Sequence, residues 1–296
     1  MSKGRCDTVL VTGASSGIGR ACAVHLADSG FRVVAASRQP ADALARDLRA
    51  EVSPGSEIQA VVLDVNDEAS VGAAVTDILR KTGRLDAIVH CAGFGVGGAI
   101  EDTSDAEVRA IFDTNFFGAL RVCRAALPAM RERGAGTLVL VSSIGGRMGL
   151  PFQGLYSASK FALEGAAESL SLEVRASGVR VVLIEPGDFR TGFTDRRSRA
   201  SGADAQSAYR QAFERALAVI QSDERGGSTP EPIARLVRRV LGSRRPRLRY
   251  TIGPLPQRAA VQLKKVLPGR VFERILALYY RLDARGRGGA TRAQGG

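Results

Sequence analysis

Short apolar runs alternate with longer amphipathic stretches over the first two thirds of the chain. Strands that are buried on both faces and separated by helices are typical of a parallel sheet covered on both sides. The pattern therefore predicts an α/β fold with a doubly wound parallel sheet, whose ligand site lies at the carboxyl ends of the strands. The runs that we expect to form strands are residues 9–11, 33–36, 60–63, 87–89, 138–141 and 181–184.

A glycine-rich turn joins the first expected strand to a helix over residues 20–29. Glycines let the backbone approach a pyrophosphate closely, and the helix N-terminus offers free N–H groups. The turn is a candidate nucleotide phosphate site, although its glycine spacing differs from GxGxxG and an ordinary strand-to-helix loop is the alternative. The residues of this cradle are Gly13, Ser15, Ser16, Gly17, Ile18 and Gly19.

A tyrosine and a lysine four residues apart are the strongest candidates for chemistry. In a helix over residues 156–177, Tyr156 and Lys160 lie one turn apart on the same face. A phenol with a usual pKa of about 10 exchanges protons poorly at neutral pH, and a nearby cation would lower that pKa. The pair predicts proton transfer at a carbonyl or alcohol oxygen, with an exposed surface pair as the alternative.

Further motifs follow the turn in order: Asp64-Val65, Ala92-Gly93, Asn115, Ser142-Ser143, Tyr156 with Lys160, and Pro186-Gly187 with Thr191. Over residues 7–194 this order resembles the short-chain dehydrogenase/reductase family. The resemblance implies a Rossmann fold and an oxidoreductase that moves a hydride between a nicotinamide cofactor and a ketone, aldehyde or alcohol. It also implies a homodimer or homotetramer, formed through long helices such as residues 104–131 and 156–177.

The roles of single residues follow from the resemblance. It makes Tyr156 the acid/base, Lys160 the group that lowers the phenol pKa and binds the nicotinamide ribose, Ser143 the holder of the carbonyl, and Asn115 the holder of a relay water. Simpler interpretations are a strand-ending serine, an ordinary helix asparagine and a turn aspartate. Besides the turn, Tyr156 and Lys160, the implied cofactor contacts are Asp64, Val65, Ala92, Gly93, Pro186, Gly187 and Thr191.

One segment departs from the family pattern. His90 and Cys91 stand where most members carry two asparagines before Ala-Gly, so the hydrogen bonds of those asparagines within the sheet need not form. We interpret His90 as a strand-end residue. The other histidine, His25, lies in the first helix, so a Ser/His/Asp hydrolase is poorly supported.

The end of the second strand indicates which cofactor is used. An acidic residue there would bind the ribose diol and repel a 2′-phosphate, whereas this chain has Ser37 and Arg38. An arginine offers a planar set of donors that suits a phosphate. We therefore predict NADP(H), with an arginine that merely extends into solvent as the alternative.

Basic residues are concentrated toward the C-terminus. The chain has 296 residues and a formal net charge of +12, and residues 231–296 contain 16 Lys and Arg against 3 Asp and Glu. We divide the chain into an NADP-binding catalytic core at 1–194, a lid over the substrate at 195–230, a basic helical extension packed on the core at 231–283, and a disordered tail at 284–296.

The extension has apolar positions at helical spacing among its basic ones, with Pro268-Gly269 between two short helices. We expect these helices to pack on the core, and contact with an anionic membrane surface is the alternative. Nucleic acid is not an expected partner, because no recognition motif accompanies the basic clusters. The four cysteines have no paired spacing, so we expect neither a metal centre nor disulfides. No apolar stretch is long enough to span a membrane. We therefore expect a cytoplasmic protein, which would be peripheral on the inner membrane surface if the extension binds lipid.

The lid has an apolar face, with Phe213 and Leu217, that favours a lipophilic substrate, and packing of this face against the domain is an equal alternative. We therefore predict an NADP(H)-dependent enzyme that interconverts a lipophilic ketone or aldehyde and its alcohol. Two alternatives are a 3-oxoacyl reductase of fatty-acid type and a non-catalytic NADP-binding scaffold or redox sensor that docks through its basic tail.

Overall fold

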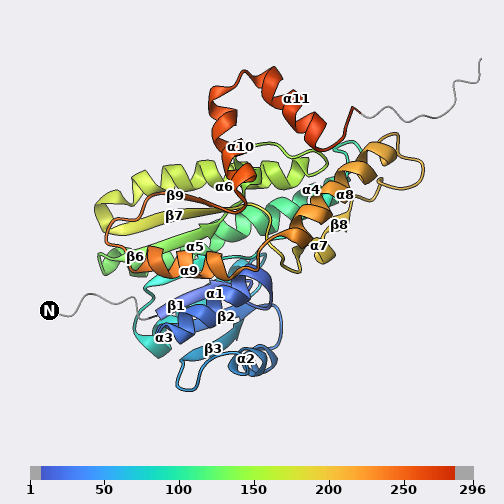
Figure 1. The fold of residues 1–296 in the computed structure, drawn as a ribbon. Coiled ribbons are helices and arrows are strands. Elements are labelled where there is room, and N and C mark those ends of the chain that lie inside the picture. The colour runs from blue at the N-terminus through green and yellow to red at the C-terminus, as the bar shows by residue number, and fades with distance from the viewer. Residues whose placement is uncertain (1–7, 284–296) are drawn as a thin grey trace, which may run out of the picture.

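The computed structural model describes residues 8–283, and its centre is a sheet of seven strands in the order β3-β2-β1-β4-β6-β7-β9 (Figure 1). All neighbouring strands are parallel, which confirms the predicted doubly wound sheet. Six strands overlap the predicted apolar runs. The strands are β1 (Thr8–Thr12), β2 (Arg32–Ser37), β3 (Ile58–Val62), β4 (Ala87–His90), β6 (Gly136–Val141), β7 (Val179–Pro186) and β9 (Arg249–Ile252).

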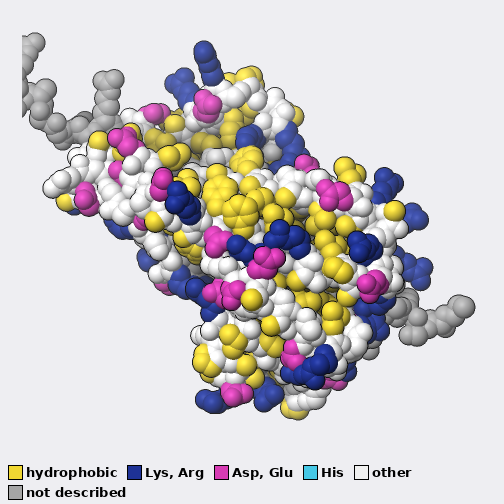
Figure 2. All heavy atoms as spheres, turned by 180° about the vertical axis from the view of Figure 1, so that it is seen from behind, with side chains coloured by type: hydrophobic (Ala, Val, Ile, Leu, Met, Phe, Trp, Pro, Cys, Tyr) yellow, Lys and Arg dark blue, Asp and Glu magenta, His cyan; other side chains and the backbone are white. Residues whose placement is uncertain are grey.

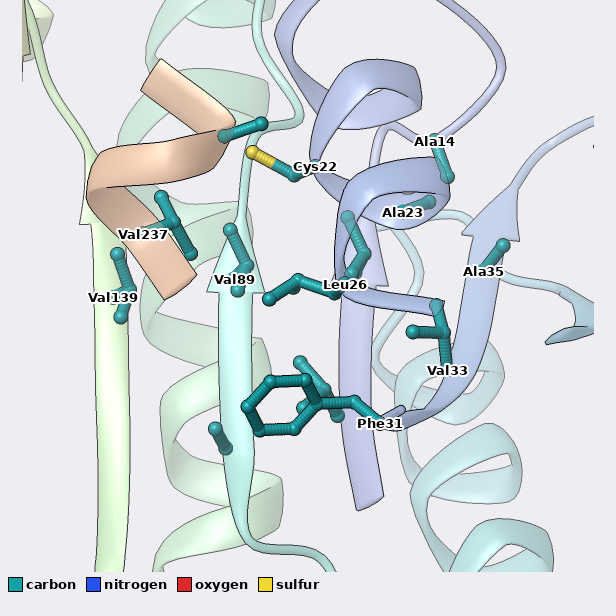
Figure 3. Packing of buried hydrophobic residues seen from close by; sticks show 14 of the residues in the cluster. Ala14, Cys22, Ala23, Leu26, Phe31, Val33, Ala35, Val89, Val139 and Val237 are labelled. Atoms are coloured by element: carbon teal, nitrogen blue, oxygen red, sulfur yellow. The ribbon is translucent and has the colours of Figure 1, made fainter. Parts of the chain in front are cut away.

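Helices cover both faces of the sheet because each presents an apolar stripe to it. On one face, Cys22 and Leu26 of α1 and Val237 of α9 point toward Val89 and Val139 of the strands (Figure 3). The opposite face is closed by a second buried apolar cluster. The covering helices are α1 (Gly17–Asp28), α2 (Ala41–Arg49) and α9 (Glu231–Leu241) on the first face, and α3 (Glu68–Thr82), α5 (Gly118–Glu132) and α6 (Gly154–Glu173) on the second.

The strand order reverses between β1 and β4, and this reversal creates the place for a ligand. From β1 the chain continues outward to β2 and β3, and then returns to β4 on the other side of β1. The loops that follow β1 and β4 therefore leave the same edge of the sheet side by side. They touch: Gly13 has a φ of +67°, and a Cβ there would lie 2.9 Å from the backbone nitrogen of Ala92.

The seventh strand was not predicted. β9 comes from the basic segment and pairs with the outer edge of β7, while α9 packs on α1, so residues 231–252 complete the core. The two short helices expected on either side of Pro268 are α10 (Leu255–Val266) and α11 (Gly269–Tyr279), which project from the body (Figure 1). The tail predicted to be disordered, 284–296, lies outside the described residues.

The segment predicted as the lid contains several short elements. α7 (Phe193–Arg196) leads into β8 (Ser198–Arg199), which pairs with β5 (Val96–Gly97), and α8 (Arg210–Gly226) packs its apolar side against α11. The helix expected over residues 104–131 is instead α4 (Asp105–Phe112) and α5 joined by a π-helical turn, Asp113–Phe117. None of the helices within residues 8–283 is long and apolar enough to cross a membrane.

Candidate active site

A groove of about 550 Å³ opens at the carboxyl ends of β1, β2 and β4. Its floor is backbone: α1 begins at Gly17, and a Cβ on Gly19 would lie 2.2 Å from the carbonyl oxygen of Gly13, so no side chain can rise between turn and helix there. A bare turn against a helix N-terminus fits a pyrophosphate. The groove is lined by these residues predicted for the cofactor: Gly13, Ser15, Ser16, Gly17, Ile18, Gly19, Arg38, Asp64, Val65, Ala92, Gly93 and Thr191.

Two side chains predicted to contact the cofactor, those of Arg38 and Asp64, lie at the rim of this groove. Arg38 is exposed directly after β2 and lines the groove, which is compatible both with a contact to a 2′-phosphate and with an arginine that extends into solvent. Asp64 also lies in the groove, but its Oδ1 accepts a hydrogen bond of 3.0 Å from the backbone nitrogen of Asn66, which is the turn role that we considered. Arg196, which sequence reasoning missed, crosses from α7 and donates to the Ser16 hydroxyl.

A smaller cavity of about 120 Å³ continues from the groove. It is bounded by the ends of β6 and β7 and by the start of α6, which begins at Gly154 and carries the tyrosine and the lysine. Lys160 Nζ lies 5.9 Å from the centre of the Tyr156 ring, so the two groups are close, as predicted. The cavity is lined by these predicted residues: Ser143, Tyr156, Lys160, Pro186, Gly187 and Thr191.

The protonation of the tyrosine differs from expectation. Burial raises the pKa of Tyr156 to about 12, and a hydrogen bond with the Ser143 side chain opposes this only in part. Burial also lowers the pKa of Lys160 to about 8, and its ammonium donates to the carbonyl oxygen of Val141 at 2.9 Å. The pKa of the phenol therefore lies above its usual value, and not below it as we expected from Lys160, because loss of hydration has the largest influence. A phenol in this state is a proton donor.

Asn115 is buried behind the cavity, in the π-helical turn between α4 and α5. Its amide nitrogen donates to the carbonyl oxygen of Phe94 at 2.9 Å and to the Ser159 hydroxyl at 3.0 Å, and its oxygen accepts from the Phe94 nitrogen at 3.0 Å. The amide thus fixes the loop after β4. A Cβ on Gly93 would lie 3.0 Å from the Asn115 oxygen and 3.6 Å from Lys160 Nζ, so only glycine leaves this approach open.

His90 ends β4, as predicted, and it replaces one family asparagine with a different hydrogen bond. Its Nδ1 lies 2.9 Å from the hydroxyl of Thr12, which also accepts from the Cys91 nitrogen at 3.3 Å and so links β1 to β4. Burial lowers the pKa of His90 to about 3, with a smaller contribution from Lys160, so the ring is neutral. This ring is bonded to Thr12 and is not available as the base of a hydrolase.

A buried ionic cluster beside the cavity was not predicted. Arg197 forms an ion pair with Glu224, and the Glu224 Oε2 accepts from the Thr194 hydroxyl at 2.7 Å. Asp188 and Glu224 both line the cavity, and burial raises the pKa of Asp188 to about 7. Only the position of Asp188, directly after the Pro-Gly motif, could have pointed to it. Within residues 8–283 no group of three or more His, Cys, Asp or Glu is placed to hold a metal.

The fold and this site define a nicotinamide-dependent oxidoreductase of the short-chain type. Residues 7–202 match the family described as short chain dehydrogenase, so the chain belongs to the short-chain dehydrogenase/reductase family. The predicted family is confirmed, and with it an oxidoreductase that acts on CH–OH groups.

The relatives cover most of the chain. It is 38% identical over 272 residues to a 3-ketodihydrosphingosine reductase of Bacteroides thetaiotaomicron, covering 92% of this chain and 97% of the relative. It is 37% identical to the estradiol 17-beta-dehydrogenase 1 of Rattus norvegicus, covering 82% and 72%. A solved short-chain dehydrogenase from Streptomyces avermitilis superposes with a TM-score of 0.77 at 31% identity, covering 93% and 98%.

Proposed function

We propose that the protein is an NADP(H)-dependent reductase of lipophilic ketones, and that Tyr156 donates the proton. The observation that carries this proposal is the position of a half-buried tyrosine, hydrogen-bonded to Ser143 and close to Lys160, in the smaller cavity that shares Gly93 and Thr191 with the nucleotide groove. The bound cofactor supplies a hydride for the carbonyl carbon. The protein supplies the complementary proton.

Each side chain has a separate task in this proposal. Tyr156 transfers its hydroxyl proton to the carbonyl oxygen as that oxygen gains negative charge, and Ser143 donates a hydrogen bond to the same oxygen. The transient phenolate would be stabilised by the nearby Lys160 ammonium, which would also hold the nicotinamide ribose. Asn115 holds the loop and helix around Lys160 in register, and a water beside it would return a proton to the lysine. Pro186, Gly187 and Thr191 would hold the nicotinamide.

The apolar lining of the cavity supports a lipophilic substrate. Leu150, Phe189 and Phe193 line it together with the polar groups. The named substrates of the two relatives, a 3-keto sphingoid base and a steroid, are both lipophilic ketones or alcohols. We therefore place a long-chain 3-ketone of the sphingoid type first, and a steroid ketone second.

A panel of carbonyl compounds tests this function. We expect NADPH oxidation with long-chain 3-ketones, and at least tenfold lower kcat/KM with short, water-soluble ketones of the same head structure, because each buried methylene contributes about 0.8 kcal/mol. Oxidation is followed at the NADPH absorbance band. A 3-oxoacyl thioester as the best substrate would instead favour the fatty-acid alternative.

We also propose that the α10–α11 hairpin contacts an anionic lipid surface. Its inner side is buried: Val261 and Phe272 pack on Ile144, Met148 and Leu150 beside the cavity. Its outer side carries basic residues and large apolar side chains in solvent. The most exposed apolar ones are Val266 at 76%, Leu255 at 73% and Leu278 at 62%. The basic residues of the two helices are Arg258, Lys265, Arg270 and Arg274, together with Lys264, whose ammonium instead turns inward and donates to the carbonyl oxygen of Arg147.

This contact predicts binding to vesicles that contain anionic lipid, and much weaker binding to neutral ones. Replacing Val266 and Leu278 together by Asp is expected to weaken vesicle binding at least tenfold, because two apolar anchors are lost and two like charges are added. Co-sedimentation measures this binding. Val62→Asp is the matched control, since Val62 is 54% exposed on β3 at the opposite edge of the sheet. An equal loss of vesicle binding in the hairpin variant and in Val62→Asp would contradict a role for the hairpin.

One feature of the molecular surface supports the predicted homodimer or homotetramer. The side of the molecule opposite to that of Figure 1 has hydrophobic side chains gathered in its middle (Figure 2). The helices expected to form the interface carry exposed Phe117, next to α5, and Phe161 of α6. Part of Phe161 is covered by Lys264 of the same chain, which lies 5.1 Å from the ring centre.

A further inference from the structure

The cavity that holds the reactive tyrosine also contains a carboxyl group that the proposed chemistry does not use. Asp188 follows Pro186-Gly187 at the end of β7 and lines the cavity together with Tyr156 and Ser143. Gln257 of α10 fixes it twice: the glutamine Oε1 accepts from the Asp188 backbone nitrogen at 2.8 Å, and its Nε2 donates to the carboxyl oxygen Oδ2. The carboxyl is therefore held in place and has no need of a ligand to order it.

The charges around this carboxyl do not balance. Glu224 also lines the cavity, and it is paired with Arg197, whose side chain is 4% exposed. The Asp188 carboxyl accepts a hydrogen bond from the Gln257 amide, whereas the ion pair of this cluster joins Arg197 to Glu224. Among these three residues of the described part of the chain there are therefore two acids for one base. An unpaired charge in a buried site is costly, and a bound cation would relieve that cost.

We propose that the Asp188 carboxylate binds an ammonium group of the substrate, carried on a carbon close to the ketone. The inference rests on the proposed function, because it places this ammonium beside the carbonyl that Tyr156 protonates. Both residues line one small cavity, so amine and carbonyl must be near neighbours in the molecule. The substrate class is an amphiphilic amino ketone, with the apolar chain leaving the cavity along the lid and the hairpin.

The protonation of Asp188 makes the proposal testable by pH. Its pKa of about 7 results from burial first and from repulsion by Glu224 and Asp223, with Gln257 and Arg197 acting in the opposite direction. The phenols of Tyr156, Tyr279 and Tyr280 face the same group and are uncharged at neutral pH. Since the carboxyl is neutral below its pKa, binding of a cation should strengthen as pH rises through about 7.

The decisive experiment compares two ketones of equal chain length, one with and one without an amino group on the carbon next to the carbonyl. In Asp188→Asn, which keeps the volume and an acceptor for Gln257, we expect KM for the amino ketone to rise about 10- to 100-fold, the usual effect of losing a charge-assisted hydrogen bond. KM for the plain ketone should change less than about twofold. Asp195→Asn removes an exposed carboxylate of α7 outside the cavity and should alter neither.

A binding measurement without turnover separates this inference from the proposed function. Calorimetry with a primary alkylamine and the alcohol of equal chain length should show tighter binding of the amine at pH 8 than at pH 6, and Asp188→Asn should abolish that difference. Such a result without reduction of either ketone would leave the cation subsite standing and refute the reductase. The subsite would be overturned if Asp188→Asn reduced both ketones with the same rise in KM. It would also be overturned if the wild-type protein bound the amine no more tightly than the alcohol. Thermal unfolding of each variant excludes a loss of fold.

Discussion

Replacing Tyr156 by Phe is expected to lower ketone reduction by about 10²- to 10⁴-fold while NADPH binding stays within about twofold, the range of a lost general acid. The phenol lines the smaller cavity, and loss of hydration there keeps it protonated, with a pKa of about 12. Phenylalanine keeps the ring and its contact with Phe193, whose ring centre lies 5.5 Å away. Only the transferable proton is removed, so kcat should fall and cofactor affinity should not.

The matched control for this variant is Tyr250→Phe. Tyr250 lies in β9, and its hydroxyl accepts from the backbone nitrogen of Arg247, outside the cavity. Single-turnover measurement with saturating NADPH reports the chemical step, and calorimetry reports cofactor binding. Turnover in Tyr156→Phe equal to that of Tyr250→Phe would show that another group donates the proton.

The features that sequence could predict are those that a few neighbouring residues determine. The glycine turn needs a positive φ at Gly13 and no side chain at Gly19, and a glycine at each position indicates both requirements directly. Tyr156 and Lys160 share a face because they are four residues apart on one helix. The central residues of strands β1, β2 and β4 are apolar because helices cover these strands on both sides.

The features that sequence missed depend on distant partners. β9 reads Arg-Tyr-Thr-Ile, with no apolar run, and becomes a strand because the edge of β7 is free to pair with it. Asp188, Arg197 and Glu224 are separated along the chain and meet only when α7 and α8 fold over the end of β7. The direction of the Tyr156 pKa shift likewise depends on how much hydration the phenol loses in the cavity, and the spacing of residues along the chain does not reveal this.

The choice of cofactor is the remaining property with a large expected effect. Arg38 is exposed at the rim of the groove, directly after β2, and no acidic residue stands at the end of that strand. Arg38→Asp replaces the donors for a 2′-phosphate by a repelling charge that can accept bonds from a ribose diol. We expect NADPH affinity to fall about 10- to 100-fold and NADH affinity to hold or rise, which reverses the preference.

Calorimetric titration of each dinucleotide without ketone measures this change independently of turnover. Arg131→Asp makes the same charge change on the exposed last turn of α5, which leads into the amino end of β6 and so lies far from the groove. Because a general loss of positive charge would weaken both dinucleotides in both variants, only a change confined to Arg38→Asp and to NADPH supports a phosphate contact. An unaltered ratio of the two affinities would mean that Arg38 extends into solvent and that the cofactor is chosen elsewhere in the groove.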